Sequence, residues 1–159
     1  MSDDEVLRFA RPDGDPGLED WRRVHNEIVP PDALTLDEVR ERNGRYHLEV
    51  AYLGEVAVGC TTVRPPAAGT GTATVIARVL PPYRGRGFGE RLYRRGLARA
   101  RELGAGTVET VVLLSNPAGL SFALSRGFTE FDRYLLPGDT VPYAELRLSP
   151  RWDDAPPAP

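Results

Sequence analysis

The chain has 159 residues, of which 41% are hydrophobic and 27% are charged, and its formal net charge at pH 7 is −3. This composition is typical of a globular protein, and no apolar run approaches the length of a membrane span. The negative charge argues against broad nucleic-acid binding, although all 20 residues counted as Lys or Arg are arginines. We therefore expect neither a nucleic-acid partner nor a membrane association.

The cysteine and histidine counts limit the chemistry further. One cysteine, Cys60, excludes an internal disulfide, and with only two histidines we expect no metal site. Residues 1–5 lack the basic and then apolar pattern of a secretory signal, so we expect a cytoplasmic protein. We expect one domain over residues 1–150 and a disordered tail over residues 151–159, which are rich in proline and alanine.

The N-terminal part predicts a strand followed by two helices. Residues 5–11 alternate between the two faces of a strand, and Asp15-Pro16 then gives an N-cap and a first-turn proline. Apolar residues recur at helical spacing up to Pro30-Pro31, which ends that helix. Thr35 and Glu38 form a capping-box pattern, and Asn43-Gly44 closes the second helix.

The remaining elements predict a sheet with helical crossovers. The expected strands cover residues 46–53 and 56–63, joined by a hairpin at Gly54-Glu55, and then residues 72–80, 108–114, 131–136 and 143–148. A loop covers residues 65–71, an amphipathic helix covers residues 87–103, and a short helix follows Pro117. This order predicts an α/β (α+β) fold, with a mixed sheet of six to seven strands and about four helices on both faces.

The most informative segment is the basic glycine loop over residues 84–89, between a strand and a helix. Gly85, Gly87 and Gly89 let the backbone approach a ligand, and Arg84 and Arg86 add charged donors suited to phosphate. The free N–H groups and dipole at a helix start also favour an anion. The loop therefore predicts a pyrophosphate site.

Two other phosphate motifs are excluded. A P-loop needs Gly-Lys-Ser/Thr at the helix start, and the chain has no lysine. A dinucleotide fingerprint beginning at Gly85 would need glycine at the position of Glu90.

The loop instead resembles the Arg/Gln-x-x-Gly-x-Gly/Ala motif of the GNAT family of N-acetyltransferases. Arg84, Gly87 and Gly89 match that motif, and Val79 and Pro81 match its Val-x-Pro lead-in. The resemblance implies that acetyl-CoA, or another acyl-CoA, is the co-substrate, that the fourth and fifth strands splay to admit its pantetheine arm, and that a homodimer is possible. The residues that it implies for cofactor binding are Ala77, Val79, Arg84, Gly85, Arg86, Gly87, Phe88, Gly89, Glu90 and Asn116.

Asn116 belongs to a second segment that is similar to the family pattern. It ends the fifth strand and is followed, after a short helix, by Gly127-Phe128. The resemblance implies that Asn116 contacts the pantetheine arm. The residue also has the position of a helix N-cap, with Pro117 at the first helical position. The two roles are compatible.

The proton-transfer groups are less clear. Many relatives carry a tyrosine seven residues after the asparagine, where this chain has Ala123, so the acid that protonates the leaving thiolate is open. Tyr83, Tyr93 and Tyr134 could contribute a hydroxyl, although packing explains each equally well. The candidate bases are Glu27, His25 and Glu109, and an ordinary surface role explains the first two at least as well.

The resulting hypothesis is an N-acetyltransferase that moves the acetyl group of acetyl-CoA to a primary amine by direct attack. The acceptor, a small molecule or a peptide, is not identified. An acidic cluster around the first two helices could attract a cationic amine, but a solvated face explains it as well. Its members are Glu27, Asp32, Asp37, Glu38 and Glu41. The alternative function, suggested by Ala123, is a degenerate acyl-CoA-binding regulatory or structural protein without turnover.

Overall fold

The computed structural model describes residues 6–148, so the expected tail over residues 151–159 lies outside the described residues. Seven strands form one sheet in the order β1-β2-β3-β4-β5-β7-β6. All neighbouring strands are antiparallel except β4 and β5, which are parallel. The strands are β1 (Leu7–Ala10), β2 (His47–Leu53), β3 (Val56–Arg64), β4 (Thr72–Val79), β5 (Thr107–Leu113), β6 (Phe128–Tyr134) and β7 (Tyr143–Leu148).

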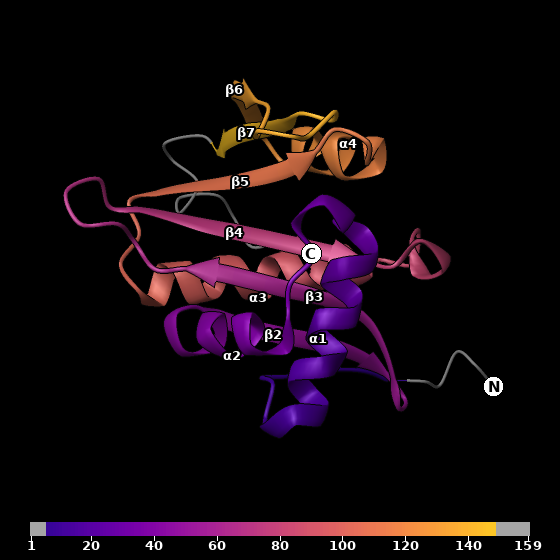
Figure 1. Cartoon of the computed structure of the whole chain (residues 1–159). Coiled ribbons are helices and arrows are strands. Elements are labelled where there is room, and N and C mark those ends of the chain that lie inside the picture. The colour runs from indigo at the N-terminus through magenta and orange to yellow at the C-terminus, as the bar shows by residue number, and fades with distance from the viewer. Residues whose placement is uncertain (1–5, 149–159) are drawn as a thin grey trace.

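Four α-helices cover the two faces of this sheet, which confirms the expected mixed α/β architecture (Figure 1). They are α1 (Gly14–Ile28), α2 (Leu36–Arg45), α3 (Phe88–Glu102) and α4 (Pro117–Ser125). Helices α1 and α2 pack on β2 and β3 around the fully buried Trp21, whose Nε1 donates to the carbonyl oxygen of Thr61 at 3.2 Å. Helices α3 and α4 contribute to a second core on the other face, which includes Tyr93, Ala123 and Phe128. None of the described helices is long and apolar enough to cross a membrane.

The helix ends follow the expected capping chemistry with two corrections. Helix α1 begins at Gly14 after Asp13, not after Asp15. The Thr35 capping box of α2 is confirmed: Thr35 Oγ1 accepts from the Glu38 N–H at 3.2 Å, and Glu38 Oε1 accepts from the Thr35 N–H at 2.9 Å. Helix α2 continues through Asn43-Gly44 to Arg45, because Gly44 does not adopt the left-handed conformation that would end it.

Gly127 was expected to close the preceding helix and Phe128 to start the next strand, and the structure confirms that start, while the strand-like run expected over residues 131–136 ends earlier. Strand β6 begins at Phe128, directly after Gly127, whose φ of 95° closes the preceding turn, and it ends at Tyr134. Pairing with β7 decides these bounds, because the register runs from Phe128 opposite Leu148 to Tyr134 opposite Tyr143. Leu135 lies beyond the last pair and is 55% exposed.

Strands β4 and β5 separate soon after they begin. They pair only from Thr72 opposite Thr107 to Thr74 opposite Glu109, and Figure 1 shows them diverging from there toward their C-terminal ends. This confirms the expected splay. Helix α3 meanwhile stays close to β4, because Gly96 has no side chain there: a Cβ atom at this position would lie 2.5 Å from Cγ1 of Val75. The split therefore opens on the β5 side of β4.

Candidate active site

A cavity of about 350 Å³ occupies the split between β4 and β5. Its walls come from both strands, from the loop before α3, and from α3 and α4. Ile28 and Val29, at the end of α1, reach it from the opposite face of the sheet. The cavity thus connects the α3 side of the sheet with the α1 side.

The open edge of β4 offers backbone groups to this cavity. The Leu80 N–H donates to the Val58 carbonyl oxygen at 2.9 Å, so the amide of Leu80 points toward β3. Because backbone direction alternates along a strand, the N–H and C=O groups of Val79 and Ala77 point the other way, into the split. Both residues, which the family resemblance implies for cofactor binding, line the cavity.

The glycine loop forms one end of the cavity. Gly85 and Gly87 have φ values of 80° and 82°, a left-handed conformation that favours glycine, and a short 3-10 turn (Pro81–Tyr83) leads into them. The first hydrogen bond of α3 runs from the Arg91 N–H to the Gly87 carbonyl oxygen at 3.2 Å. Within residues 6–148, the N–H groups of residues 85–90 donate to no other group. The loop therefore presents free donors at the positive end of a helix dipole.

The two arginines of the loop are placed differently. Arg84 lines the cavity, and its Nε donates to the Val79 carbonyl oxygen at 2.8 Å. Partial desolvation lowers the pKa of Arg84, although the residue as a whole is exposed, so its charge remains available to an anion at the mouth of the cavity. The guanidinium of Arg86 rests over the ring of Phe88, 4.9 Å from its centroid. Arg86 is not part of the cavity wall.

Asn116 and Glu90 also belong to the cavity wall. The side chain of Asn116 accepts a hydrogen bond from the Gly119 N–H at 3.1 Å, so it caps α4 while also facing the cavity. The carboxylate of Glu90 accepts a hydrogen bond from Nε of Arg126 and so joins the start of α3 to the end of α4. All the residues predicted to bind the cofactor lie in the cavity wall except Arg86.

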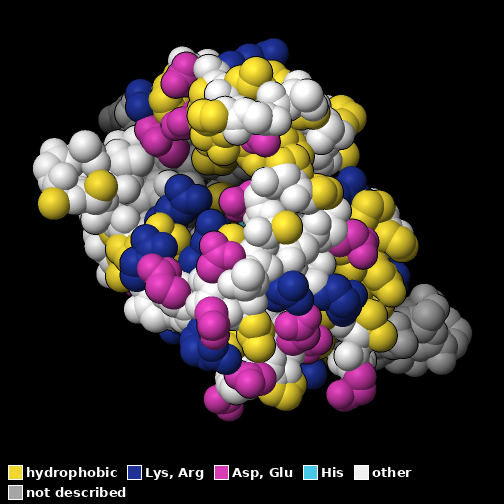
Figure 2. Space-filling view, in the orientation of Figure 1, with side chains coloured by type: hydrophobic (Ala, Val, Ile, Leu, Met, Phe, Trp, Pro, Cys, Tyr) yellow, Lys and Arg dark blue, Asp and Glu magenta, His cyan; other side chains and the backbone are white. Residues whose placement is uncertain are grey.

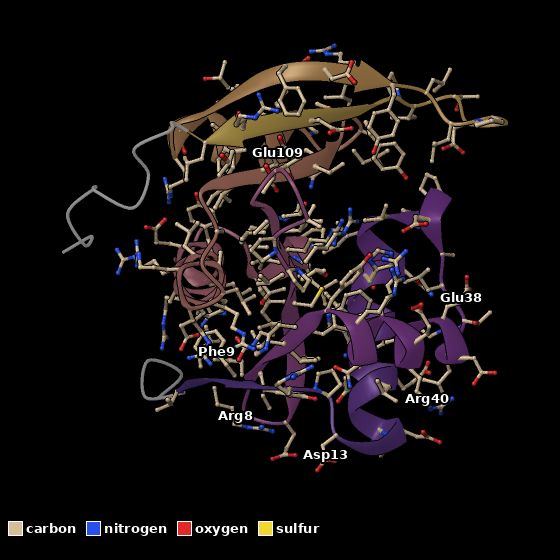
Figure 3. All side chains as sticks on the ribbon, turned by 90° about the vertical axis from the view of Figure 1, so that its left-hand side faces the viewer. Arg8, Phe9, Asp13, Glu38, Arg40 and Glu109 are labelled. Carbon is tan, nitrogen blue, oxygen red and sulfur yellow. The ribbon has the colours of Figure 1, made fainter. Side chains whose placement is uncertain are left out.

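None of the three candidate bases is part of the cavity wall. His25 is 1% exposed, stacks on Trp21 with ring centroids 5.0 Å apart, and places Nε2 3.3 Å from Oδ2 of Asp32. Glu27 is exposed, and the two residues that follow it reach the cavity in its place. Glu109 lies on β5, where its Oε2 accepts from Nε and Nη2 of Arg147 at 3.0 and 2.7 Å (Figure 3).

Tyr93, one of the three tyrosines that the sequence left open as a source of a hydroxyl, lies in the cavity wall. It is 6% exposed, and its ring packs edge-on against Phe122 and Phe128, with centroids 5.9 and 5.7 Å away. Its buried hydroxyl has no hydrogen-bond partner among the described residues. Ala123, at the position where the family resemblance implies a tyrosine, lines the same cavity. The sequence showed a tyrosine on α3 but could not show that its hydroxyl would be unpartnered.

No group of three or more His, Cys, Asp or Glu side chains within residues 6–148 is arranged to hold a metal ion. The acidic cluster is also largely occupied with local contacts. Asp37 pairs with Arg40, Glu41 pairs with Arg45, and Glu38 closes the capping box. These carboxylates therefore do not form an acceptor site at the cavity.

Comparisons with known structures support the same fold. A structure described as a putative phosphinothricin N-acetyltransferase is 19% identical, with 90% of this chain and 98% of that chain covered and a TM-score of 0.72. The yncA protein of Salmonella typhimurium, described as a putative acetyltransferase with its cofactor acetyl-CoA, is 19% identical over 96% and 99% of the two chains, with a TM-score of 0.72. A ribosomal-protein-alanine N-acetyltransferase from Brucella melitensis is 20% identical over 89% and 98%, with a TM-score of 0.68.

At these identities the structures establish a shared fold and not a shared substrate. No curated protein sequence matches the chain significantly. The model of the acetyltransferase (GNAT) family, however, matches residues 13–128, which is more than half of the chain and includes both the glycine loop and Asn116. The chain belongs to the GNAT family of acetyltransferases.

Proposed function

We propose that the protein transfers the acetyl group of acetyl-CoA to a primary amine by direct attack, without an acyl-enzyme intermediate. The observation that carries this proposal is the row of free backbone N–H groups in residues 85–90, at the end of a cavity that continues between β4 and β5. Such donors at a helix start fit a diphosphate, and the slot beyond them fits a narrow arm. GNAT enzymes use acetyl-CoA, and the residues present here suit that co-substrate.

Each part of the wall would hold a different part of the co-substrate. The N–H groups of residues 85–90, together with Arg84, would bind the diphosphate. The backbone edge at Ala77 and Val79 would align the pantetheine arm, with Asn116 on the facing side. An N–H of this edge near Val79 would stabilise the oxyanion, because a fixed donor that faces a dry slot needs no reorganisation during the reaction.

The attacking amine must lose a proton, and a lysine-like amine with a pKa of about 10 is mostly protonated at neutral pH. The one carboxylate in the described cavity wall, Glu90, is already bound to Arg126. We therefore assign deprotonation to water at the α1 side of the cavity, with no side chain acting directly as the base.

For the leaving thiolate we assign the proton to Tyr93. Burial, followed by the charge of Glu90, raises the pKa of Tyr93 while Arg126 opposes the shift, so the phenol stays protonated at neutral pH. Its hydroxyl lacks a partner among the described residues and would gain one from a bound co-substrate. Tyr93 would thus supply, from α3, the phenol that Ala123 cannot supply from α4.

Two measurements on the full chain test the proposal. Calorimetry should show saturable binding of acetyl-CoA, and thiol release should depend on an added amine, with the acetylated amine identified by mass. Binding without thiol release from any amine, peptide or aminoglycoside would favour the alternative, an acyl-CoA-binding protein without turnover. Failure to bind acetyl-CoA would reject both.

A further inference from the structure

The α1 end of the cavity contains one charged residue, Arg78, among the described residues of the wall. Arg78 lies on β4 opposite Cys60 of β3, and Cys60 packs with Trp21 beneath α1, so the Arg78 side chain lies on the α1 face. The other charged residues of the wall are Arg84, Glu90 and Arg126, which belong to the loop, to α3 and to the segment after α4. Arg78 is therefore the charge that an incoming acceptor would meet.

The guanidinium of Arg78 is partly buried, yet no ion pair or hydrogen bond joins it to another group within residues 6–148. Burial lowers the pKa of Arg78, and the positive charges of Arg64 and Arg42 lower it further, while Cys60 and Asp32 act in the opposite direction. An arginine remains charged under these conditions. The fold thus keeps an unneutralised cation at the cavity, which costs stability unless a ligand compensates it.

The charges of two further arginines, Arg42 and Arg64, act on Arg78. Nη2 of Arg42 lies 3.5 Å from Oδ2 of Asp32, and Nε2 of His25 lies 3.3 Å from the same oxygen. Arg64 stands over the ring of Tyr46, 5.6 Å from its centroid, and its buried Nε has no partner in the described structure. One carboxylate, Asp32, is therefore shared by a histidine and an arginine, and cannot neutralise the three guanidinium groups.

The carboxylates of β6 and β7 do not neutralise the guanidinium groups of these three arginines. Glu145 of β7 and Asp132 of β6 lie opposite each other, and neither is part of the cavity wall. Burial raises the pKa of Glu145, and the charges of Glu109 and Asp132 raise it further, while the charges of Arg64 and Arg147 oppose the shift. Glu145 therefore acts on Arg64 from a distance, and its carboxylate forms no ion pair with Arg64, Arg42 or Arg78 in the described structure. In Figure 2, dark-blue arginine side chains lie left of the middle of this face, with magenta acidic side chains between and beside them.

We infer that the acceptor is a small amine that also carries a carboxylate, as an amino acid does, and that Arg78, supported by Arg42 and Arg64, binds that carboxylate. A planar guanidinium binds a carboxylate through two parallel hydrogen bonds, whereas a purely cationic acceptor would meet like charge. Because Arg78 is adjacent in sequence to Ala77 and Val79, the bound carboxylate would lie close to the reacting carbonyl. A short separation between carboxylate and amine is therefore expected.

The inference rests on the proposed function, and the reaction balances within it. The amine nitrogen forms a bond to the acetyl carbon, and the bond between that carbon and sulfur breaks. The nitrogen's proton leaves to water, the thiolate takes a proton from Tyr93, and water returns a proton to the Tyr93 oxygen. The carboxylate of the acceptor is unchanged and serves only to position the amine.

The test compares thiol release from the full chain with three sets of acceptors: amino acids, their amides and their decarboxylated amines. At least one amino acid should exceed its own amide and amine by about tenfold or more in kcat/KM, as expected for loss of a charged hydrogen bond. Arg78→Gln should raise the KM of that amino acid by a similar factor, with the acetyl-CoA Kd unchanged and Tm unchanged or higher. Arg40→Gln is the matched control, because Arg40 lies on the outer side of α2 and pairs with Asp15 and Asp37 (Figure 3).

Two results would overturn the inference, and they differ in what they leave standing. If amines without a carboxylate are acetylated as well as or better than every amino acid, the acceptor class is wrong while the acetyltransferase assignment stands. If acetyl-CoA binds but no amine of any set releases thiol, the proposed function fails and the acceptor class fails with it.

Discussion

Nε of Arg84 donates a hydrogen bond to the carbonyl oxygen of Val79 at 2.8 Å, and this bond ties the glycine loop to the last residue of β4. The oxygen would otherwise point into the split unpaired, because β5 has already diverged. The Arg84 side chain therefore gives the carbonyl oxygen at the end of β4 a hydrogen-bond donor, and it also holds a positive charge beside the free N–H groups of the loop. It links the two parts of the site that a diphosphate and a pantetheine arm would occupy.

Replacing Arg84 should weaken the binding of acetyl-CoA more than it weakens the fold. Arg84→Gln removes a charged donor beside the diphosphate and a hydrogen bond to Val79, so calorimetry should show a rise in Kd of about tenfold or more. Arg40→Gln changes the net charge equally on the surface of α2 and should leave the Kd within about threefold. Equal losses in the two variants would show that overall charge, and not the position of Arg84, attracts the ligand.

Replacing Tyr93 should lower the activity without lowering the stability of the fold. Tyr93→Phe removes a buried hydroxyl that has no partner among the described residues, so Tm should stay the same or rise. If the phenol protonates the leaving thiolate, kcat should fall by about 10²-fold, with little change in the Kd of acetyl-CoA.

The control for Tyr93 is Tyr52→Phe. The hydroxyl of Tyr52 donates to Oδ2 of Asp20 at 2.7 Å, away from the cavity, so this variant should lose some stability and keep its kcat. An unchanged kcat in Tyr93→Phe would remove Tyr93 from the mechanism and leave water as the proton source.

Glu49 should make the free energy of unfolding depend on pH in the acid range. It is 7% exposed, and its two oxygens accept from Nε and Nη2 of Arg95, both at 2.8 Å. Burial alone would raise the pKa of Glu49, but the bonds and charge of Arg95, with His47, hold it below the ordinary value of 4.5. A depressed pKa in the folded state gives stability that is present above the unfolded-state pKa and is lost as the pH falls through the folded-state pKa.

Urea unfolding of Glu49→Gln tests this directly. At pH 7 the variant should be less stable than the wild type by about 1–3 kcal/mol. The difference should shrink as the pH falls below about 4.5. Glu55→Gln, at an exposed position in the β2–β3 turn, should match the wild type throughout. A difference for Glu49→Gln that is independent of pH would mean that packing, not the charge, is responsible.

The glycine loop and the order of elements could be predicted from the sequence because both depend on the spacing of residues that are close together in the chain. Gly85 and Gly87 indicated a loop whose backbone can approach a ligand, and Thr35 with Glu38 indicated a capped helix, without knowledge of distant contacts. The end of the sixth strand was missed because it depends on pairing with β7, and the local sequence does not specify that partner.

The roles of individual polar side chains were also beyond the sequence. Glu109 was a reasonable candidate base until the sheet order placed Arg147 beside it. The sequence does not distinguish Arg78 from the other arginines of the chain. Only the fold shows that Arg78 lines the cavity and lacks a carboxylate partner in the described structure. Both cases depend on neighbours that are far away in the sequence.

The most direct test of the account is calorimetry of acetyl-CoA binding to Gly87→Leu and to its matched control, Gly69→Leu. Both glycines have a positive φ, 82° and 87°, and a Cβ at either position would meet nothing within 4 Å, so the two changes impose similar backbone strain. Gly87 lines the cavity, and Gly69 does not. We predict that Gly87→Leu abolishes binding while the protein stays folded, and that Gly69→Leu binds as the wild type does. Unchanged affinity in Gly87→Leu would contradict the assignment of the loop to the diphosphate.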